Sequence, residues 1–148
     1  MIYSAACAYA IRALSHLAAE KPEGYLLLED LCEGTDLPRH FVAKILQDLV
    51  RRELLISAKG RGGGFALARP PKKIRLYDIV AAVDGIKQFN DCVVGLAKCD
   101  EHQPCPLHDQ WKNLRKVIES FLLKTTLAQM SATLQRKLEH LGRTLPER

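Results

Sequence analysis

Three cysteines and one histidine, all able to bind metal, lie close together in one polar segment: Cys92, Cys99, Cys105 and His108. Six residues separate the first two cysteines, five separate the next two, and two separate the last cysteine from the histidine. Thiolates are soft ligands for iron–sulfur clusters and zinc, and an imidazole can complete either set. One glycine and two prolines in the same segment can shape the turns of a chelating loop. The segment therefore indicates metal or redox chemistry.

The spacing of these ligands favours a cluster and leaves other occupants open. Closed zinc sites often use ligand pairs two residues apart, and here only Cys105 and His108 are that close. The wider gaps suit a larger, cage-like cofactor, so we favour an iron–sulfur cluster over a zinc ion or free thiols. The chain has five cysteines, and an odd number argues against a disulfide framework.

Length and composition fit one domain, or one small domain with an extension. The chain has 148 residues, of which 47% are hydrophobic and 26% charged, and this excludes a disordered chain. No stretch approaches the roughly 18 apolar residues of a membrane helix, so we expect no membrane partner. The N-terminus is apolar but has no basic region ahead of it, which indicates a mature helix rather than a signal peptide. We therefore expect the protein in the cytoplasm.

Positive charge is concentrated in one part of the chain. The net charge is +5, yet the stretch 39–75 alone has ten Lys and Arg residues against two acids, a local charge of +8. The rest of the chain is therefore slightly acidic. A basic face of this kind favours a polyanionic partner such as nucleic acid.

The order of the predicted elements is typical of a winged helix-turn-helix. Apolar spacing predicts helices over 4–19, 26–33 and 38–52, with a turn at 34–36 between the second and third. Two short strands, 54–58 and 65–68, flank a glycine-rich tip, and a helix follows at 76–83. The fold class is therefore mainly α with a small β-hairpin wing. In this fold the third helix enters the DNA major groove.

The third helix and the wing supply the predicted contacts to double-stranded operator DNA. Polar and small residues near the helix start, and the tip of the wing, form the set: Arg39, His40, Ala43, Lys44, Lys59, Gly60, Arg61, Gly62 and Gly63. Arg and Lys can donate to guanine edges, and the wing can approach phosphates or the minor groove. The opposite face of the helix is predicted to be a buried stripe: Phe41, Ile45, Leu46, Leu49 and Val50.

A long apolar stripe follows the cysteine segment. It runs along a helix from Asp109 and, after a break near Thr125-Thr126, along a second one: Trp111, Leu114, Ile118, Phe121, Leu122, Leu127, Met130, Leu134, Leu138 and Leu141. Because a small winged domain offers little surface to cover it, we expect a homodimer, with an intramolecular helical hairpin as the alternative. This predicts a DNA-binding domain at 1–85, a cluster loop at 86–108 and a dimerisation region at 109–148.

The most specific motif is the wing string KGRGGGFALARP at 59–70. It resembles a family signature of arginine, GxGGG, an aromatic residue and a terminal Arg-Pro. Similar matches occur in YAIRAL at 9–14, YDIVAAVDG at 77–85, CPLH at 105–108 followed by Trp111, and TLA at 126–128. By these motifs nearly the whole chain resembles the Rrf-two (Rrf2) family of bacterial transcription regulators. The resemblance implies a homodimeric, operator-binding winged helix-turn-helix with a cluster loop beside a long dimer helix.

The resemblance also carries site residues. The three cysteines of the loop match cluster ligands, and His108 matches the histidine that serves as fourth ligand in some members. The favoured cofactor is therefore a [2Fe–2S] cluster, with [4Fe–4S] as the other option. This chain departs in its first gap, six residues instead of five, and has Ala8 where another member uses an acidic ligand. Cys7 beside it is a rival fourth ligand, and its other interpretation is a small buried core residue.

These features predict a transcriptional regulator whose operator binding follows a cluster that senses redox state, nitric oxide or cluster status. A cluster-free thiol switch or a zinc-stabilised DNA-binding regulator is the alternative. A small thiol oxidoreductase is a remote one, because the chain has no CxxC pair and no phosphate loop of the nucleotide-binding kind. We therefore expect no enzyme activity.

Overall fold

The computed structural model describes residues 2–140 except 22, 34, 36 and 98, and within the last helix it leaves out the side chains at 135, 138 and 139. Two residues of the predicted turn, Gly34 and Asp36, lie outside this description, as do the side chain of Leu138 and all of Leu141. Within the described residues, none of the helices combines the length and apolar character that crossing a bilayer requires.

Three helices begin the fold: α1 (Ala5–Glu20), α2 (Leu28–Cys32) and α3 (Arg39–Arg51). Ser4 caps α1, because its hydroxyl accepts a hydrogen bond from the Cys7 backbone N–H at 3.1 Å. The second helix is shorter than predicted. Leu26 instead forms an antiparallel bridge with Phe65, and its backbone exchanges two hydrogen bonds of 2.9 Å with that residue.

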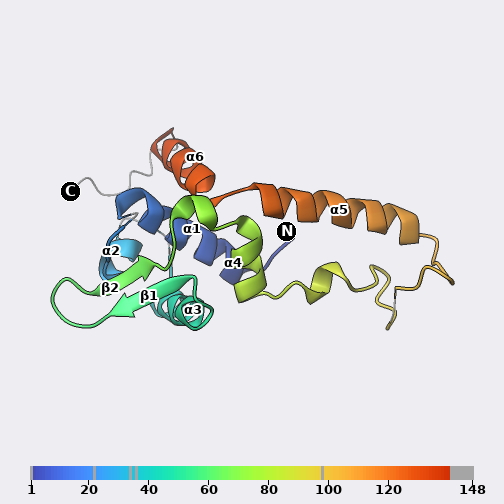
Figure 1. The fold of residues 1–148 in the computed structure, drawn as a ribbon, viewed down its shortest axis with the longest axis horizontal. Coiled ribbons are helices and arrows are strands. Elements are labelled where there is room, and N and C mark those ends of the chain that lie inside the picture. Colours follow the sequence, from blue (N-terminus) through green and yellow to red (C-terminus); the bar gives the residue numbers. More distant parts are fainter. Residues whose placement is uncertain (1, 22, 34, 36, 98, 141–148) are drawn as a thin grey trace.

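The wing is an antiparallel hairpin of β1 (Leu55–Ala58) and β2 (Gly64–Leu67), visible at one end of the molecule in Figure 1. Leu55 pairs with Leu67, and Ala58 pairs with Gly64. Gly64 has a φ of +123°, and a Cβ at this position would overlap the backbone carbonyl of Leu26. Only glycine therefore allows the wing to lie this close to the segment before α2.

The remaining elements are η1 (Pro71–Lys73), α4 (Leu76–Val83), η2 (Lys87–Phe89), α5 (His108–Lys124) and α6 (Leu127–His140). The predicted break falls between α5 and α6. There the Leu76 N–H donates to the Thr125 carbonyl at 2.9 Å and the Leu127 N–H donates to the Ile74 carbonyl at 2.8 Å. This bridge joins the end of α5 to the base of the wing domain.

The core is built from the apolar faces of α1, α3 and α4 and includes the α5–α6 junction through Leu122 and Leu127. The predicted stripe on α3 is largely correct, since Ile45, Leu46 and Leu49 are buried. The prediction that Phe41 belongs to the buried stripe is wrong. Its side chain is 45% exposed and its ring forms a T-shaped pair with Tyr9, with ring centroids 5.8 Å apart, while Val42 takes the buried position.

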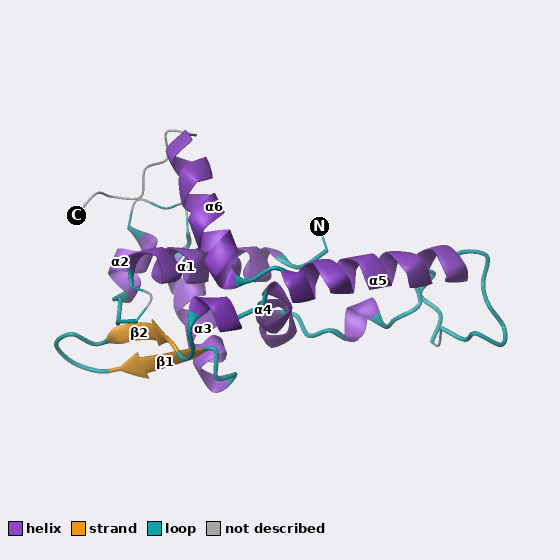
Figure 2. Ribbon diagram, turned by 45° about the horizontal axis from the view of Figure 1, so that its top comes forward, coloured by secondary structure: helices purple, strands orange, loops and turns teal. Residues whose placement is uncertain are grey.

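The C-terminal stripe is divided between two environments. α6 packs on α1 of the same chain, so Leu127 and Met130 join the winged domain's own core and do not need a partner. α5 instead extends away from the body (Figures 1 and 2), and Leu114, Val117 and Phe121 remain about half exposed or more. In the described part of the chain, α5 and α6 do not form the antiparallel hairpin that we considered as the alternative.

Candidate DNA-binding surface and cysteine loop

The start of α3 carries the side chains predicted to read DNA. Arg39, His40 and Lys44 are exposed and Ala43 is half-buried, as a recognition surface requires. The Arg39 guanidinium forms an ion pair with the Glu29 carboxylate of α2, a partner that the sequence did not suggest. Arg39 also lies near Cys32. Burial raises the pKa of that thiol, and the positive charge of Arg39 lowers it by a smaller amount.

The wing tip presents two cations to solvent. Lys59, Gly60, Arg61 and Gly62 are all exposed, and among the described residues no ion pair engages either cation. Gly63 differs from the other predicted contacts because it is buried. Its N–H donates to the Gly60 carbonyl at 3.1 Å, and a Cβ there would overlap the Ala58 carbonyl, so this glycine closes the tip turn.

The cysteine loop brings its four candidate ligands together as two pairs. The Cys99 Sγ lies 3.3 Å from the Nδ1 of His108, the first residue of α5. Cys105 hydrogen-bonds Cys92 through its side chain. The structure thus brings His108 to the cysteines, although within the described residues no three ligand side chains are gathered as a finished metal site. As a donor set, three thiols and an imidazole fit an iron–sulfur cluster.

The backbone around Cys92 favours its thiolate form. N–H groups of Val94 and Leu96 hydrogen-bond the sulfur and hold the pKa of this thiol below its usual value. Cys92 is only 8% exposed and His108 only 5%. Amide hydrogen bonds to a cysteine sulfur at a shielded position would stabilise the negative charge of a ligating thiolate without water.

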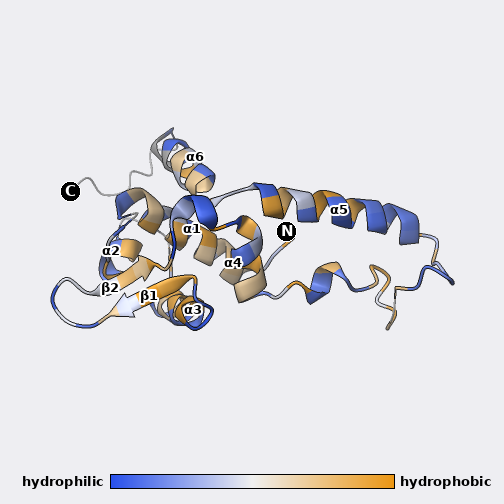
Figure 3. Cartoon of the chain, in the orientation of Figure 1, coloured by the Kyte–Doolittle hydropathy of each residue, from blue (hydrophilic) through white to orange (hydrophobic). Residues whose placement is uncertain are grey.

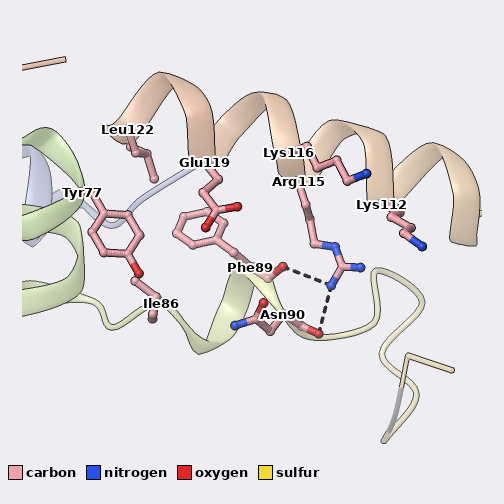
Figure 4. Close-up of a pocket in the computed structure, with 9 residues that line it drawn as sticks. All are labelled: Tyr77, Ile86, Phe89, Asn90, Lys112, Arg115, Lys116, Glu119 and Leu122. Carbon is pink, nitrogen blue, oxygen red and sulfur yellow. Dashed lines mark hydrogen bonds between the residues drawn. The ribbon is translucent and has the colours of Figure 1, made fainter. Parts of the chain in front are cut away.

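The loop is held against α5 at the end nearest Cys92. The Trp111 indole N–H donates to the Asp91 carbonyl at 3.0 Å, and Arg115 donates to the carbonyls of Phe89 and Asn90 at 3.5 and 3.3 Å. Figure 4 shows Arg115 crossing a cavity of about 260 Å³ between α4, η2 and α5 to reach these carbonyls. The position of Cys92 therefore depends on α5, the helix that also carries His108.

Cys7 is the candidate ligand that the structure places elsewhere. It is fully buried in the core on α1, and burial raises the pKa of its thiol to about 12, with a further contribution from Asp84. The interpretation of Cys7 as a small core residue fits this position. Cys32 is partly buried against the same core.

The wing and the cysteine loop lie at opposite ends of the molecule (Figure 1). One covalent and hydrogen-bonded route connects them: α5 begins at His108 and ends at the bridge to 74–76, directly after η1 and the wing. Figure 3 shows hydrophobic positions on α5 and along the loop, where Val93, Val94 and Leu96 are about half exposed.

A three-helix head with an exposed recognition helix and a basic hairpin wing defines a winged helix-turn-helix DNA-binding regulator. The chain belongs to the Rrf2 family, described as iron-dependent transcriptional regulators, whose family model matches residues 3–133. The family and the relatives below are regulators rather than enzymes, which confirms the prediction that this chain is not an enzyme.

Relatives with curated names agree with this class. The chain is 33% identical over 132 residues to a protein from Aquifex aeolicus named as an HTH-type transcriptional regulator, covering 88% of this chain and 91% of that one. It is 28% identical over 122 residues to the HTH-type transcriptional regulator IscR of Serratia proteamaculans, covering 82% and 74% of the two chains.

Solved structures share the fold. The T. potens IscR structure matches with a TM-score of 0.72 at 25% identity, over 90% of this chain and 88% of that one. CymR, the global cysteine regulator of B. subtilis, matches with a TM-score of 0.72 at 22% identity, over 88% and 95%. These matches confirm the predicted fold class of helices with a hairpin wing.

Proposed function

We propose that this chain is a homodimeric regulator whose binding to operator DNA changes with an iron–sulfur cluster held by Cys92, Cys99, Cys105 and His108. One observation carries the cluster part. A loop tied to α5 places Cys99 Sγ 3.3 Å from His108 Nδ1 and surrounds the Cys92 sulfur with backbone N–H groups. A histidine in the ligand set favours a [2Fe–2S] over a [4Fe–4S] cluster.

In this proposal residues 1–85 bind DNA. The first turn of α3 enters the major groove, where Arg39, His40 and Lys44 meet base edges beside Ala43. The wing tip, residues 59–63, contacts phosphates or the minor groove, and Lys59 and Arg61 supply its charge. Because the tip glycines have no Cβ, the backbone can approach the duplex closely.

Within the proposed dimer region, residues 109–148, a second copy covers the outer face of α5. Leu114, Val117 and Phe121 are 50%, 65% and 48% exposed on that face. Three large apolar side chains at helical spacing on one exposed face are typical of a helix that pairs with another chain. A dimer also presents two recognition helices to two DNA half-sites.

Residues 86–108 hold the cluster. When bound, it supplies a reactive centre that oxidation, nitric oxide or cluster loss can alter. The chain's own residues do the rest: Trp111 and Arg115 fix the loop on α5. Any shift of α5 is transmitted by the Leu76–Thr125 and Ile74–Leu127 hydrogen bonds to the base of the wing.

A cluster-free thiol switch is the second candidate, and a specific observation favours it. Among the structural neighbours are a global cysteine regulator and an oxidised form of CymR from Staphylococcus aureus. In such a regulator the half-buried thiols of Cys99 and Cys105 would respond to oxidants directly. A zinc ion on the same ligands would instead stabilise the loop without redox chemistry.

The test is anaerobic purification followed by an absorption spectrum with iron, zinc and acid-labile sulfide assays. We expect visible absorption with matching iron and sulfide, lost in Cys92→Ala, Cys99→Ala or Cys105→Ala and retained in Cys7→Ala. A colourless protein after anaerobic reconstitution would refute the cluster. Stoichiometric zinc would then identify the protein as a zinc-stabilised regulator, and the absence of metal would identify it as a thiol switch.

A further inference from the structure

An ion pair joins α2 to α3 at the point where the recognition helix begins. Glu29 lies in the first turn of α2, and Arg39 is the first residue of α3. The Arg39 Nη2 donates to the Glu29 carboxylate. The two side chains are 53% and 64% exposed, so the pair is open to solvent beside the first turn of α3, which the proposed function places in the major groove.

Hydrogen bonds and buried leucines hold the described residues on both sides of the turn between α2 and α3. The Thr35 hydroxyl donates to the Cys32 carbonyl at 2.7 Å and accepts from the Leu37 N–H at 3.3 Å. Leu31 and Leu37, on either side of the turn, are buried in the core. These contacts place the backbones of α2 and of the start of α3 against the same core, so the Glu29 carboxylate lies within reach of the Arg39 side chain.

An exposed ion pair contributes little to stability, so its main consequence is the orientation of the guanidinium. Arginine has a long, mobile side chain, and its planar group carries five N–H donors in a rigid fork. One nitrogen engaged by Glu29 leaves the remaining donors available for the two acceptors of a guanine edge. Holding the fork in advance reduces the ordering that DNA binding would otherwise require.

We propose that Glu29 is a positioning residue for base recognition: its carboxylate holds Arg39 so that the remaining N–H groups face one base pair of the operator. The inference rests on the proposed role of Arg39 in DNA reading. It makes a prediction opposite to simple electrostatics. A carboxylate near phosphates weakens binding to all sequences, so its removal alone would raise affinity uniformly.

The experiment selects bound duplexes from a pool with a randomised central segment, using full-length protein purified anaerobically. Arg39→Ala first identifies the base pair that Arg39 reads. Glu29→Gln is then expected to lose preference at that same base pair, by about fivefold, and at no other. In the Arg39→Ala background, Glu29→Gln is expected to cause no further loss. Glu33→Gln removes an equal charge from the exposed C-terminal cap of α2 and should keep the full preference.

Three outcomes would overturn the inference, and each has a separate meaning. If Glu29→Gln kept the base preference and bound all sequences more tightly, Glu29 would act only by repelling the DNA phosphates. An equal loss at every base pair, or in Glu33→Gln as well, would indicate a general effect of charge or folding, which thermal unfolding of each variant would separate. Unchanged preference in Arg39→Ala would instead refute the proposed role of Arg39 itself, on which the inference depends.

Discussion

Removing the charge of Arg61 should change how operator affinity depends on salt. This residue is exposed at the wing tip, and no ion pair in the described part of the chain engages it. Each phosphate contact contributes about 0.9 to the slope of log K against log salt, so the two wings of a dimer contribute about 1.8. Doubling the salt lowers the affinity of both proteins for DNA. The factor of this loss should therefore be about 3.5 times smaller for Arg61→Ala than for the unchanged protein.

The assay is fluorescence anisotropy with a labelled duplex over a series of salt concentrations. The loss should be similar for operator and unrelated duplexes, because a phosphate contact carries no sequence information. Lys87→Ala is the matched control, since it removes one exposed cation from η2, next to the cysteine loop and away from the wing. An unchanged slope in Arg61→Ala, or an equal change in Lys87→Ala, would refute the assignment of the wing.

Three further predictions concern stability and reactivity. Gly64→Ala should lower the free energy of unfolding by about 2 kcal/mol or more in urea titrations, because its φ of +123° and the nearby Leu26 carbonyl both exclude a Cβ. Leu127→Ala should cost about 3 kcal/mol, since this side chain is fully buried at the α5–α6 junction, whereas Leu27→Ala, at a side chain that is 47% exposed, should cost far less in the same titration. Cys7 should resist iodoacetamide at pH 8 in folded, cluster-free protein while Cys99 and Cys105 react, as peptide mass spectrometry would show. Its pKa of about 12 keeps the thiol protonated at every pH well below that value, and modification of Cys7 before unfolding would contradict its burial.

Much of the fold follows from local patterns in the sequence. Apolar spacing placed α1, α3 and α4 within a residue or two of their observed ends, and the glycine run located the wing tip. These predictions succeeded because each element's own residues determine its period and its ends. The error at Leu26 has a tertiary cause: its bridge to Phe65 draws it into the sheet, and no local signal marks that pairing.

Packing between distant segments could not be predicted in the same way. An apolar stripe shows that a helix must be covered, but not by which surface, so the packing of α6 on α1 was missed. Phe41 has the chemistry of a core residue, yet its side chain is 45% exposed beside Tyr9, and this exposure depends on the tertiary geometry. The pairing of Arg39 with Glu29 likewise needs the angle between two helices.

The candidate ligands were predictable because cysteine and histidine are few and their side chains are chemically distinctive. How the loop is held could not be predicted from the sequence. Trp111 was predicted only as part of the apolar stripe and of a family motif, and Arg115 was not singled out, because their bonds to the carbonyls of 89–91 depend on the folded chain. The backbone N–H groups around Cys92 are another tertiary feature that residue types cannot reveal.

In the proposed regulator, the cluster and the DNA-binding surface are coupled. The most direct measurement compares the affinity of cluster-loaded and cluster-free protein for one selected operator duplex, at one salt concentration and without oxygen. We expect the two affinities to differ by about tenfold, and the Cys105→Ala variant to match the cluster-free value. Equal affinities in the loaded and cluster-free forms would contradict the account, even if the protein binds both the cluster and DNA.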